Sequence, residues 1–191
     1  WFGLAGTTVA STGTTLGLLD IREASARALD RAGPDTHGGY GKVNLSLART
    51  TQLNPRWLLN TSVRAQHALF GKNLDGSEDM SISGITGVKA YPVDEIAAEN
   101  AVFFNADVRY AVLAGNPLNL QIGACTEVGH ASMENDVGSA TTRNLSDVGL
   151  ELYTQYDQFF SSVQLAARIG SPATSENVDR TRIFWQVGAS F

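Results

Sequence analysis

Few residues in this 191-residue chain have the types and spacing that active-site chemistry needs. None of the three histidines has a second ligand at the spacing that a metal site requires, and we expect each at the surface, in or near a loop. These histidines are His37, His67 and His130. The acidic pairs Glu78-Asp79 and Asp94-Glu95 fall in a long expected loop, where neighbouring carboxylates face water and offer too few oxygens for Ca²⁺. Without a nucleophile elbow or a phosphate loop, the sequence predicts a protein that is not an enzyme and has no cofactor and no metal.

The composition restricts the classes of partner and fold. The net charge of −5 argues against nucleic acid as a partner. Charged residues make up 17% of the chain, below the roughly 25% usual in soluble domains, and 19 glycines with 5 prolines suit strands and turns. No apolar run is long enough for a membrane-spanning helix, but membrane-spanning strands need apolar residues only at every second position. The single cysteine, Cys125, excludes an internal disulfide.

Polar and apolar residues alternate along the expected strands. In 101–113, Val102 and Phe104 fall on one face, and Asn105 and Asp107 fall on the other. The runs 56–69, 118–129, 147–157 and 182–191 repeat this pattern. We expect the polar faces to line a water-filled lumen. Its expected lining residues are Asn105, Asp107, Arg109, Gln121, Glu127, Glu151 and Arg168.

The alternation by itself leaves two fold classes, because soluble barrels show it with the apolar face inward. Two features favour lipid: the polar faces are rich in Gly, Asn, Gln and paired charges, and aromatic residues collect at one end of the strands. The alternative for the aromatics is their general preference for strands. The aromatic residues in question are Trp57, Tyr110, Tyr156, Phe159 and Phe191. The sequence therefore predicts an all-β fold, a transmembrane antiparallel β-barrel surrounded by outer-membrane lipid.

Short and long connections alternate between the strand-like runs. We count nine runs: 2–10, 14–21, 40–51, 56–69, 101–113, 118–129, 147–157, 159–169 and 182–191. The short connections are 11–13, 52–55, 114–117 and 158, and the long ones are 22–39, 70–100, 130–146 and 171–179. Outer-membrane barrels have short periplasmic turns and long external loops. The Ala-rich, charged segment 22–31 suits a short helix in one of these loops.

An odd number of strands conflicts with the even numbers of bacterial single-chain barrels, and an open sheet leaves unpaired edges in lipid. Either strands upstream are missing or the interpretation of 1–21 is wrong; we expect missing strands. Trp1 opens inside an apparent strand with no signal peptide before it. We therefore expect 1–191 to be the C-terminal part of a larger barrel.

The long loop carries a series of short motifs. They are, in order, Ser77-Glu78, Ser83-Gly84, Val88-Lys89-Ala90-Tyr91 and Asp94-Glu95. This segment resembles the signature region of two-partner secretion transporters, the haemolysin-activator-like (TpsB-type) outer-membrane proteins. The segments 39–68, 118–131, 145–153 and 182–191 are also similar to this family, so the resemblance covers nearly the whole chain. It implies a sixteen-stranded barrel, of which this chain is roughly the second half, with loop 70–100 folded into the lumen.

The resemblance also implies a contact between that loop and the barrel wall. In the family, the Arg of a Val-Arg-Gly/Ala-Tyr motif meets the Asp of a Phe-x-Asp-x-Gly strand. Here Lys89 stands for the Arg, Glu127 for the Asp and Cys125 for the Phe, whereas Gly129 keeps the Gly. Lys lacks the two-pronged guanidinium, and Glu adds one methylene of reach. We expect a Lys89–Glu127 ion pair screened by lumen water and worth about 1 kcal/mol, against the alternative of a solvated Lys89.

The chain ends on an alternating aromatic strand. Trp185, Gly188 and Phe191 resemble the terminal signal that the barrel assembly machinery recognises, and the alternative is an ordinary hydrophobic last strand.

Together, these features predict a pore in the outer membrane of a Gram-negative bacterium that secretes a partner exoprotein, expected to be of β-helical type. The alternatives are an assembly factor or insertase of the same superfamily, a passive porin and, with least support, an outer-membrane enzyme. Two upstream periplasmic domains would favour secretion over assembly.

Overall fold

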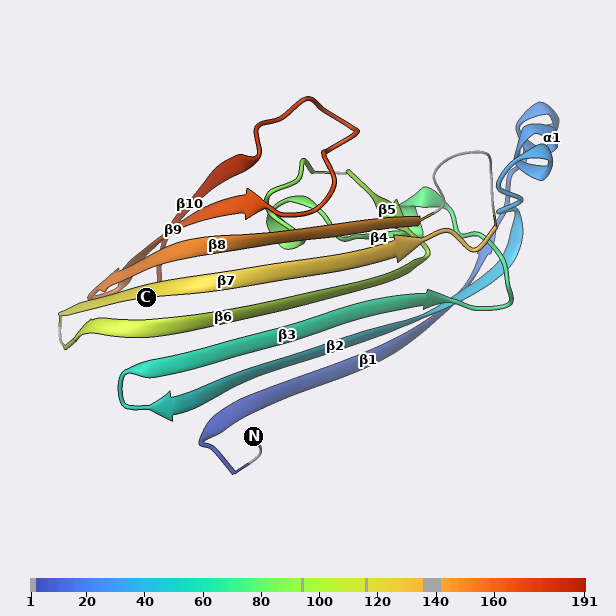
Figure 1. Ribbon diagram of the computed structural model, residues 1–191. Helices are drawn as coiled ribbons and strands as arrows, with labels where there is room; N and C mark the ends of the chain where they lie inside the picture. Colours follow the sequence, from blue (N-terminus) through green and yellow to red (C-terminus); the bar gives the residue numbers. More distant parts are fainter. Residues whose placement is uncertain (1–2, 94, 116, 136–141) are drawn as a thin grey trace.

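The protein is one curved antiparallel sheet with a long loop folded against one of its faces (Figure 1). The computed structural model describes residues 3–93, 95–115, 117–135 and 142–191. Its strands and helices are β1 (Gly6–Leu19), α1 (Ala24–Ala32), β2 (Gly38–Asn54), β3 (Trp57–Ala68), η1 (Gly76–Glu78), β4 (Met80–Ser81), η2 (Gly84–Thr86), β5 (Ala97–Ala98), β6 (Asn100–Ala114), β7 (Leu118–Ser132), β8 (Thr142–Tyr156), β9 (Phe159–Arg168) and β10 (Thr181–Ala189).

Among the described residues, the large sheet has eight strands in the order β1-β2-β3-β6-β7-β8-β9-β10, and β4 pairs only with β5. The expected turn at 11–13 is wrong, because a single strand, β1 (Gly6–Leu19), runs through it. Ser11 pairs with Ser46 and Gly13 with Asn44 in an unbroken register with β2. A polar Ser-Thr-Gly sequence resembles a turn, but a long neighbouring strand keeps it extended by hydrogen bonding. The expectation of nine strands is therefore corrected to eight in this sheet.

The two ends of the sheet differ as the connections predict. The turns between β2 and β3, β6 and β7, and β8 and β9 lie at the end where both termini lie, and the long loops and α1 lie at the other (Figure 1). The expected helix in 22–31 is confirmed as α1, whose N-terminus is capped by the Glu23 carboxylate. At the short-turn end, Trp57 pairs with Tyr110 across β3 and β6, and Tyr156 pairs with Phe159 across β8 and β9.

The sheet is apolar on the face that carries no loop, here called the outer face. Its large apolar side chains are exposed, and Leu150 in the middle of β8 is 63% exposed. Further exposed apolar residues on this face are Val102, Phe104, Ile122, Val128, Val148, Leu152, Leu165, Ile183 and Trp185. The opposite, inner face buries polar residues such as Asp107, Glu127 and Asp147. This arrangement is the reverse of a soluble barrel and matches strands that face lipid.

An arginine on the outer face should therefore destabilise the protein more than one on the inner face. We expect Leu150→Arg to lower the free energy of unfolding in lipid vesicles by about 2–4 kcal/mol, because the guanidinium would enter hydrocarbon. Gln186→Arg on β10 is the control, since Gln186 lines an inner-face cavity. Equal losses for both variants in denaturant titrations would contradict this orientation.

The loop between β3 and β6, residues 69–99, lies against the inner face and contains η1, β4, η2 and β5. Most of the buried apolar core lies between this loop and strands β6 to β9 rather than between two sheets. No helix in the described part of the chain has the length and apolar character needed to cross a bilayer.

Candidate functional site

The site is the contact between loop 69–99 and the inner face of the sheet. Ile82, Val88, Ala90 and Tyr91 of the loop are completely buried there. A glycine on β7 makes room for the loop, because a Cβ on Gly129 would lie 2.8 Å from Cδ1 of Ile82. The loop thus approaches the wall more closely than a side chain at position 129 would allow.

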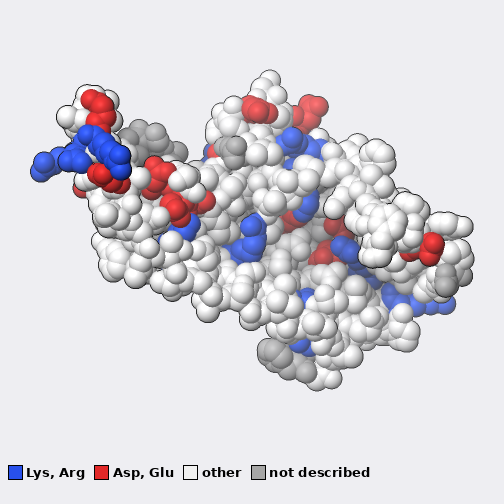
Figure 2. Space-filling view, turned by 180° about the vertical axis from the view of Figure 1, so that it is seen from behind, with Lys and Arg blue, Asp and Glu red and all other residues white. Residues whose placement is uncertain are grey.

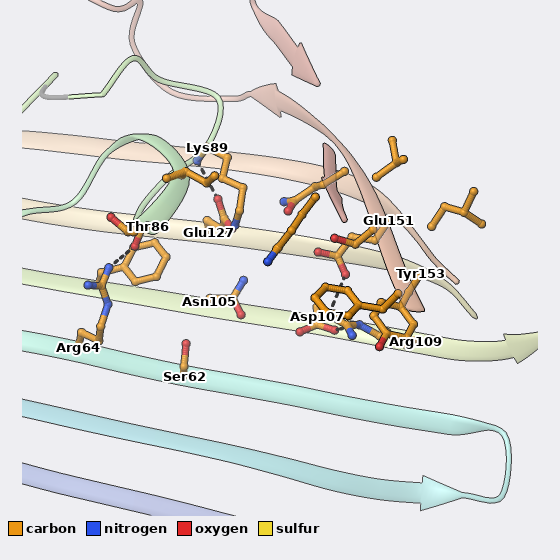
Figure 3. Close-up of a pocket in the computed structure, with 18 residues that line it drawn as sticks. Ser62, Arg64, Thr86, Lys89, Asn105, Asp107, Arg109, Glu127, Glu151 and Tyr153 are labelled. Carbon is orange, nitrogen blue, oxygen red and sulfur yellow. Dashed lines mark hydrogen bonds and ion pairs between the residues drawn. The ribbon is translucent and has the colours of Figure 1, made fainter. Parts of the chain in front are cut away.

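Lys89 and Glu127 are in direct contact at this interface (Figure 3). The Lys89 Nζ forms an ion pair with Oε1 of Glu127, and the Lys89 backbone N–H donates to Oε2 at 2.8 Å. Glu127 is 0% exposed and the Lys89 side chain is 20% exposed, so lumen water would screen the pair less than expected. The charges lie under the loop instead, where their interaction is much stronger than in water. The role of this pair in secretion stays a prediction.

Asp147 is a further site residue, to which the sequence interpretation assigned no role. It is fully buried and lies opposite Glu127 in the β7–β8 register. Its Oδ2 accepts a hydrogen bond from the Ala90 backbone N–H at 2.9 Å. Glu127 and Asp147 therefore hold two successive backbone N–H groups of the motif, at Lys89 and Ala90. The signal in the sequence was the place of Asp147 on the polar face of its strand.

Tyr91 anchors the end of the motif to the last strands. Its hydroxyl donates to the Ser171 carbonyl at 2.9 Å, and its own carbonyl accepts from Arg182 of β10 at 2.7 Å. The Arg168 guanidinium lies 5.6 Å from the centre of the Tyr91 ring. A Cβ on Gly170 would lie 2.8 Å from the Tyr91 hydroxyl, so a side chain there would displace it. Tyr91 thus ties the loop to β9, β10 and the segment between them.

Glu95 makes a second anchor, which the sequence interpretation placed in water. Its side chain is fully buried, pairs with Arg143 of β8, and accepts from the backbone N–H groups of Thr174 and Ser175 at 2.8 and 3.0 Å. Both hydroxyls also donate to it. Burial opposes its ionisation, but the hydrogen bonds from Ser175 and Thr174 outweigh burial and lower the pKa of Glu95 to about 2. Asp94, the other member of the expected pair, lies outside the described residues.

Beside the motif, the inner face is hollowed by a cavity of about 480 Å³. Asn105, Asp107, Arg109 and Glu151 line it together with Glu127 and Lys89, whereas Gln121 and Arg168 do not (Figure 3). Arg109 joins two acids, with Nε 2.7 Å from Asp107 and Nη2 3.3 Å from Glu151. Charged side chains gather in this hollow when the molecule is seen from behind (Figure 2). The wall beside the motif is therefore polar and internally charge-paired.

Arg64 of β3 also contacts the loop, which the sequence interpretation did not foresee. Its guanidinium donates to the Thr86 carbonyl and lies 5.0 Å from the centre of the Phe103 ring. Strands on both sides of the motif therefore hold the loop.

The expected assembly-signal residues lie on the edge strand β10 and just after it. Trp185 on the outer face donates from Nε1 to the Ser161 hydroxyl at 2.9 Å, and Phe191 is exposed. Gly188 lies under the Phe160 ring, where a Cβ would come within 2.5 Å of ring carbons. Recognition by an assembly machinery stays a prediction.

The histidines differ in part from the expectation of surface positions in or near loops. His67 and His130 are exposed but lie within β3 and β7. His37 is half-buried, and its Nδ1 accepts the Ile21 backbone N–H at 3.1 Å. His67 and His130 therefore belong to strands, and His37 contacts the backbone just after β1.

Comparison with known proteins shows that this chain has a fold similar to that of a solved structure. The chain matches no protein-family model, and no curated protein matches it. Among solved structures it is similar to CdiB from Escherichia coli, with a TM-score of 0.78, 16% sequence identity and coverage of 97% of this chain. The match covers 34% of CdiB, so the chain spans about a third of that protein's length. The chain shares the all-β barrel fold of CdiB over nearly its whole length.

Proposed function

We propose that the chain is part of an outer-membrane pore that secretes a partner exoprotein in a two-partner secretion system. The likeness to CdiB, a two-partner secretion transporter, supports a transporter role at the level of the fold. The observation that carries the proposal is the seating of the motif 88–91 on Glu127 and Asp147 of the inner face. A passive porin could also have a long loop that constricts its pore, but that loop would not carry the motif 88–91.

Further strands would complete this architecture as a closed barrel. Within the described residues, β1 and β10 each pair on one side only. Open edges are very costly in lipid, so further strands of a longer protein would join them and close the barrel. The chain would then be the C-terminal part of a barrel in a Gram-negative outer membrane, with the inner face lining the lumen and 69–99 as its plug. The assembly machinery would recognise Trp185, Gly188 and Phe191.

Secretion requires the plug to move and the wall to let a polypeptide pass. The polar residues of the wall offer hydrogen bonds to a passing unfolded chain and would not retain it by hydrophobic contact. The expected cargo is a β-helical exoprotein. The interactions of Lys89 and Glu95 hold the loop in the closed state.

Removing the plug tests this function. In the intact transporter, deletion of 78–95 is expected to raise single-channel conductance in planar bilayers and to change secretion. Gly129→Leu is a second variant that displaces Ile82 without deletion, and we expect it to raise conductance in the same direction. Gly13→Leu on β1 is the matched control, because a Cβ there meets no atom within 4 Å. Unaltered conductance and secretion in both the deletion and Gly129→Leu would refute the plug.

A further inference from the structure

A second cavity, also of about 480 Å³, lies at the long-loop end of the molecule, apart from the contact at Lys89. Residues from the helix-bearing loop and from loop 69–99 line it, together with Met133 directly after β7. Four of the lining residues are acids: Asp30, Asp75, Asp79 and Glu99. Acidic side chains are visible beside helix α1 in Figure 2.

Two of these acids lie opposite each other. In the β4–β5 ribbon, Met80 pairs with Ala98 in antiparallel register. The next residues outward are Asp79 and Glu99, so the two carboxylates are cross-strand neighbours on one cavity. Like charges directly opposite each other destabilise a strand pair.

Each of the two carboxylates has an oxygen without a hydrogen-bond partner. Glu99 is 4% exposed, and both its Oε2 and the Oδ1 of Asp79 are buried without a hydrogen-bond partner. Among the described residues, no Lys, Arg or His forms an ion pair with either acid. Asp79 is half-buried, so the expectation that it faces water holds only in part.

The charged groups around the pair are already engaged. Lys42 pairs with Glu78 at 2.8 Å, and the Lys72 ammonium donates to the His37 carbonyl. The other two acids are satisfied locally, since Asp75 accepts from Ser77 and Asp30 accepts from Thr36 and His37. Burial, followed by the charges of Glu99 and Asp75, raises the pKa of Asp79 to about 7. Unpaired buried carboxylates are costly, and a bound cation would relieve that cost.

We propose that Asp79 and Glu99 bind a divalent alkaline-earth cation, Ca²⁺ or Mg²⁺, at the long-loop end of the protein. Both ions are hard cations that bind carboxylate oxygens, and Mg²⁺ commonly keeps several waters beside one or two carboxylates. The cavity has room for such waters. No group of three or more His, Cys, Asp or Glu in the described residues is placed to hold a metal, so water molecules would have to complete the coordination around the two carboxylates. The cation would link the segment before β4 to the segment after β5 within loop 69–99, and this inference does not depend on the secretion function.

The test is thermal unfolding of the detergent-solubilised protein with CaCl₂, MgCl₂ or ionic-strength-matched KCl, together with calorimetric titration of each divalent ion. We expect a dissociation constant of about 0.1–1 mM, as in weak extracellular sites. Asp79→Asn and Glu99→Gln should each weaken binding at least tenfold. In EDTA the same variants should unfold at a higher temperature than the unmodified protein, because one of the two opposed charges is gone. In saturating divalent ion, the unmodified protein should instead unfold at a higher temperature than either variant.

Asp157→Asn is the matched control, because it removes the same charge from the turn at the opposite end, and it should bind the ion normally. The separate Ca²⁺ and Mg²⁺ titrations identify which ion is preferred. Stabilisation equal in KCl, or divalent binding unchanged in both variants, would overturn the proposal. So would a stability in EDTA that falls from pH 5 to 8 with no divalent effect, since a shared proton would then hold the pair.

Discussion

Replacing Lys89 by methionine is expected to destabilise the protein by about 3–5 kcal/mol and to free the motif 88–91 from the wall. Lys89 is the cation paired with Glu127, which is fully buried and lies opposite the buried Asp147. Without the ammonium, two carboxylates face each other and only backbone N–H groups compensate their charge. The loss is measured as the free energy of unfolding in denaturant titrations, and the freed loop as higher channel conductance.

Two variants separate the buried charge from a general effect of losing a lysine. Lys89→Arg keeps the cation and should retain most of the stability. Lys42→Met removes a lysine whose partner Glu78 is 29% exposed, and it should cost less than Lys89→Met, because the Glu78 carboxylate keeps contact with water whereas Glu127 does not. If Lys89→Met costs no more than Lys42→Met, the buried pair does not hold the loop. If Lys89→Glu with Glu127→Lys secretes no better than either single change, the contact does not matter for secretion.

The second large effect is expected from Glu95→Ala, which should destabilise the protein by about 3 kcal/mol. The substitution leaves the half-buried guanidinium of Arg143 without its carboxylate and removes the acceptor of two backbone N–H groups, at Thr174 and Ser175. The segment between β9 and β10 should then detach from loop 69–99. Limited proteolysis should cut 171–179 much faster than in the unmodified protein.

The matched control for this substitution is Glu176→Ala, one residue beyond the anchor. Glu176 is exposed, so its loss should leave both stability and proteolysis unchanged. Equal cleavage of the two variants would show that Glu95 does not anchor the segment.

The contribution of Glu95 should also depend on pH in a defined direction. Its pKa falls from 4.5 to about 2 on folding, so the folded state favours the ionised carboxylate. The stability difference between the unmodified protein and Glu95→Ala should be constant above about pH 5. It should shrink as the pH falls from 4.5 through 2, where the folded carboxylate is protonated. A difference that grows in acid would contradict a buried, ionised anchor.

The places where the sequence interpretation went wrong share one cause. The turn expected at 11–13 is absent because β2 pairs along the whole of β1. Asp147 and Glu95 received no role because their partners lie far along the chain: Ala90 is 57 residues from Asp147, and Thr174 is 79 residues from Glu95. Contacts of this kind leave no local pattern.

By itself, the sequence determined the class of fold, the alternation of short and long connections, and the face on which each strand residue lies. These features depend on the period-two geometry of a strand and on local turn composition, which neighbouring residues express directly. Only the tertiary structure decided that the Lys89–Glu127 pair is buried, that Asp147 and Glu95 also hold the loop, and that Asp79 and Glu99 face each other. Burial and charge pairing depend on how loop 69–99 packs against strands distant in sequence, and this packing sets how strongly each charge interacts.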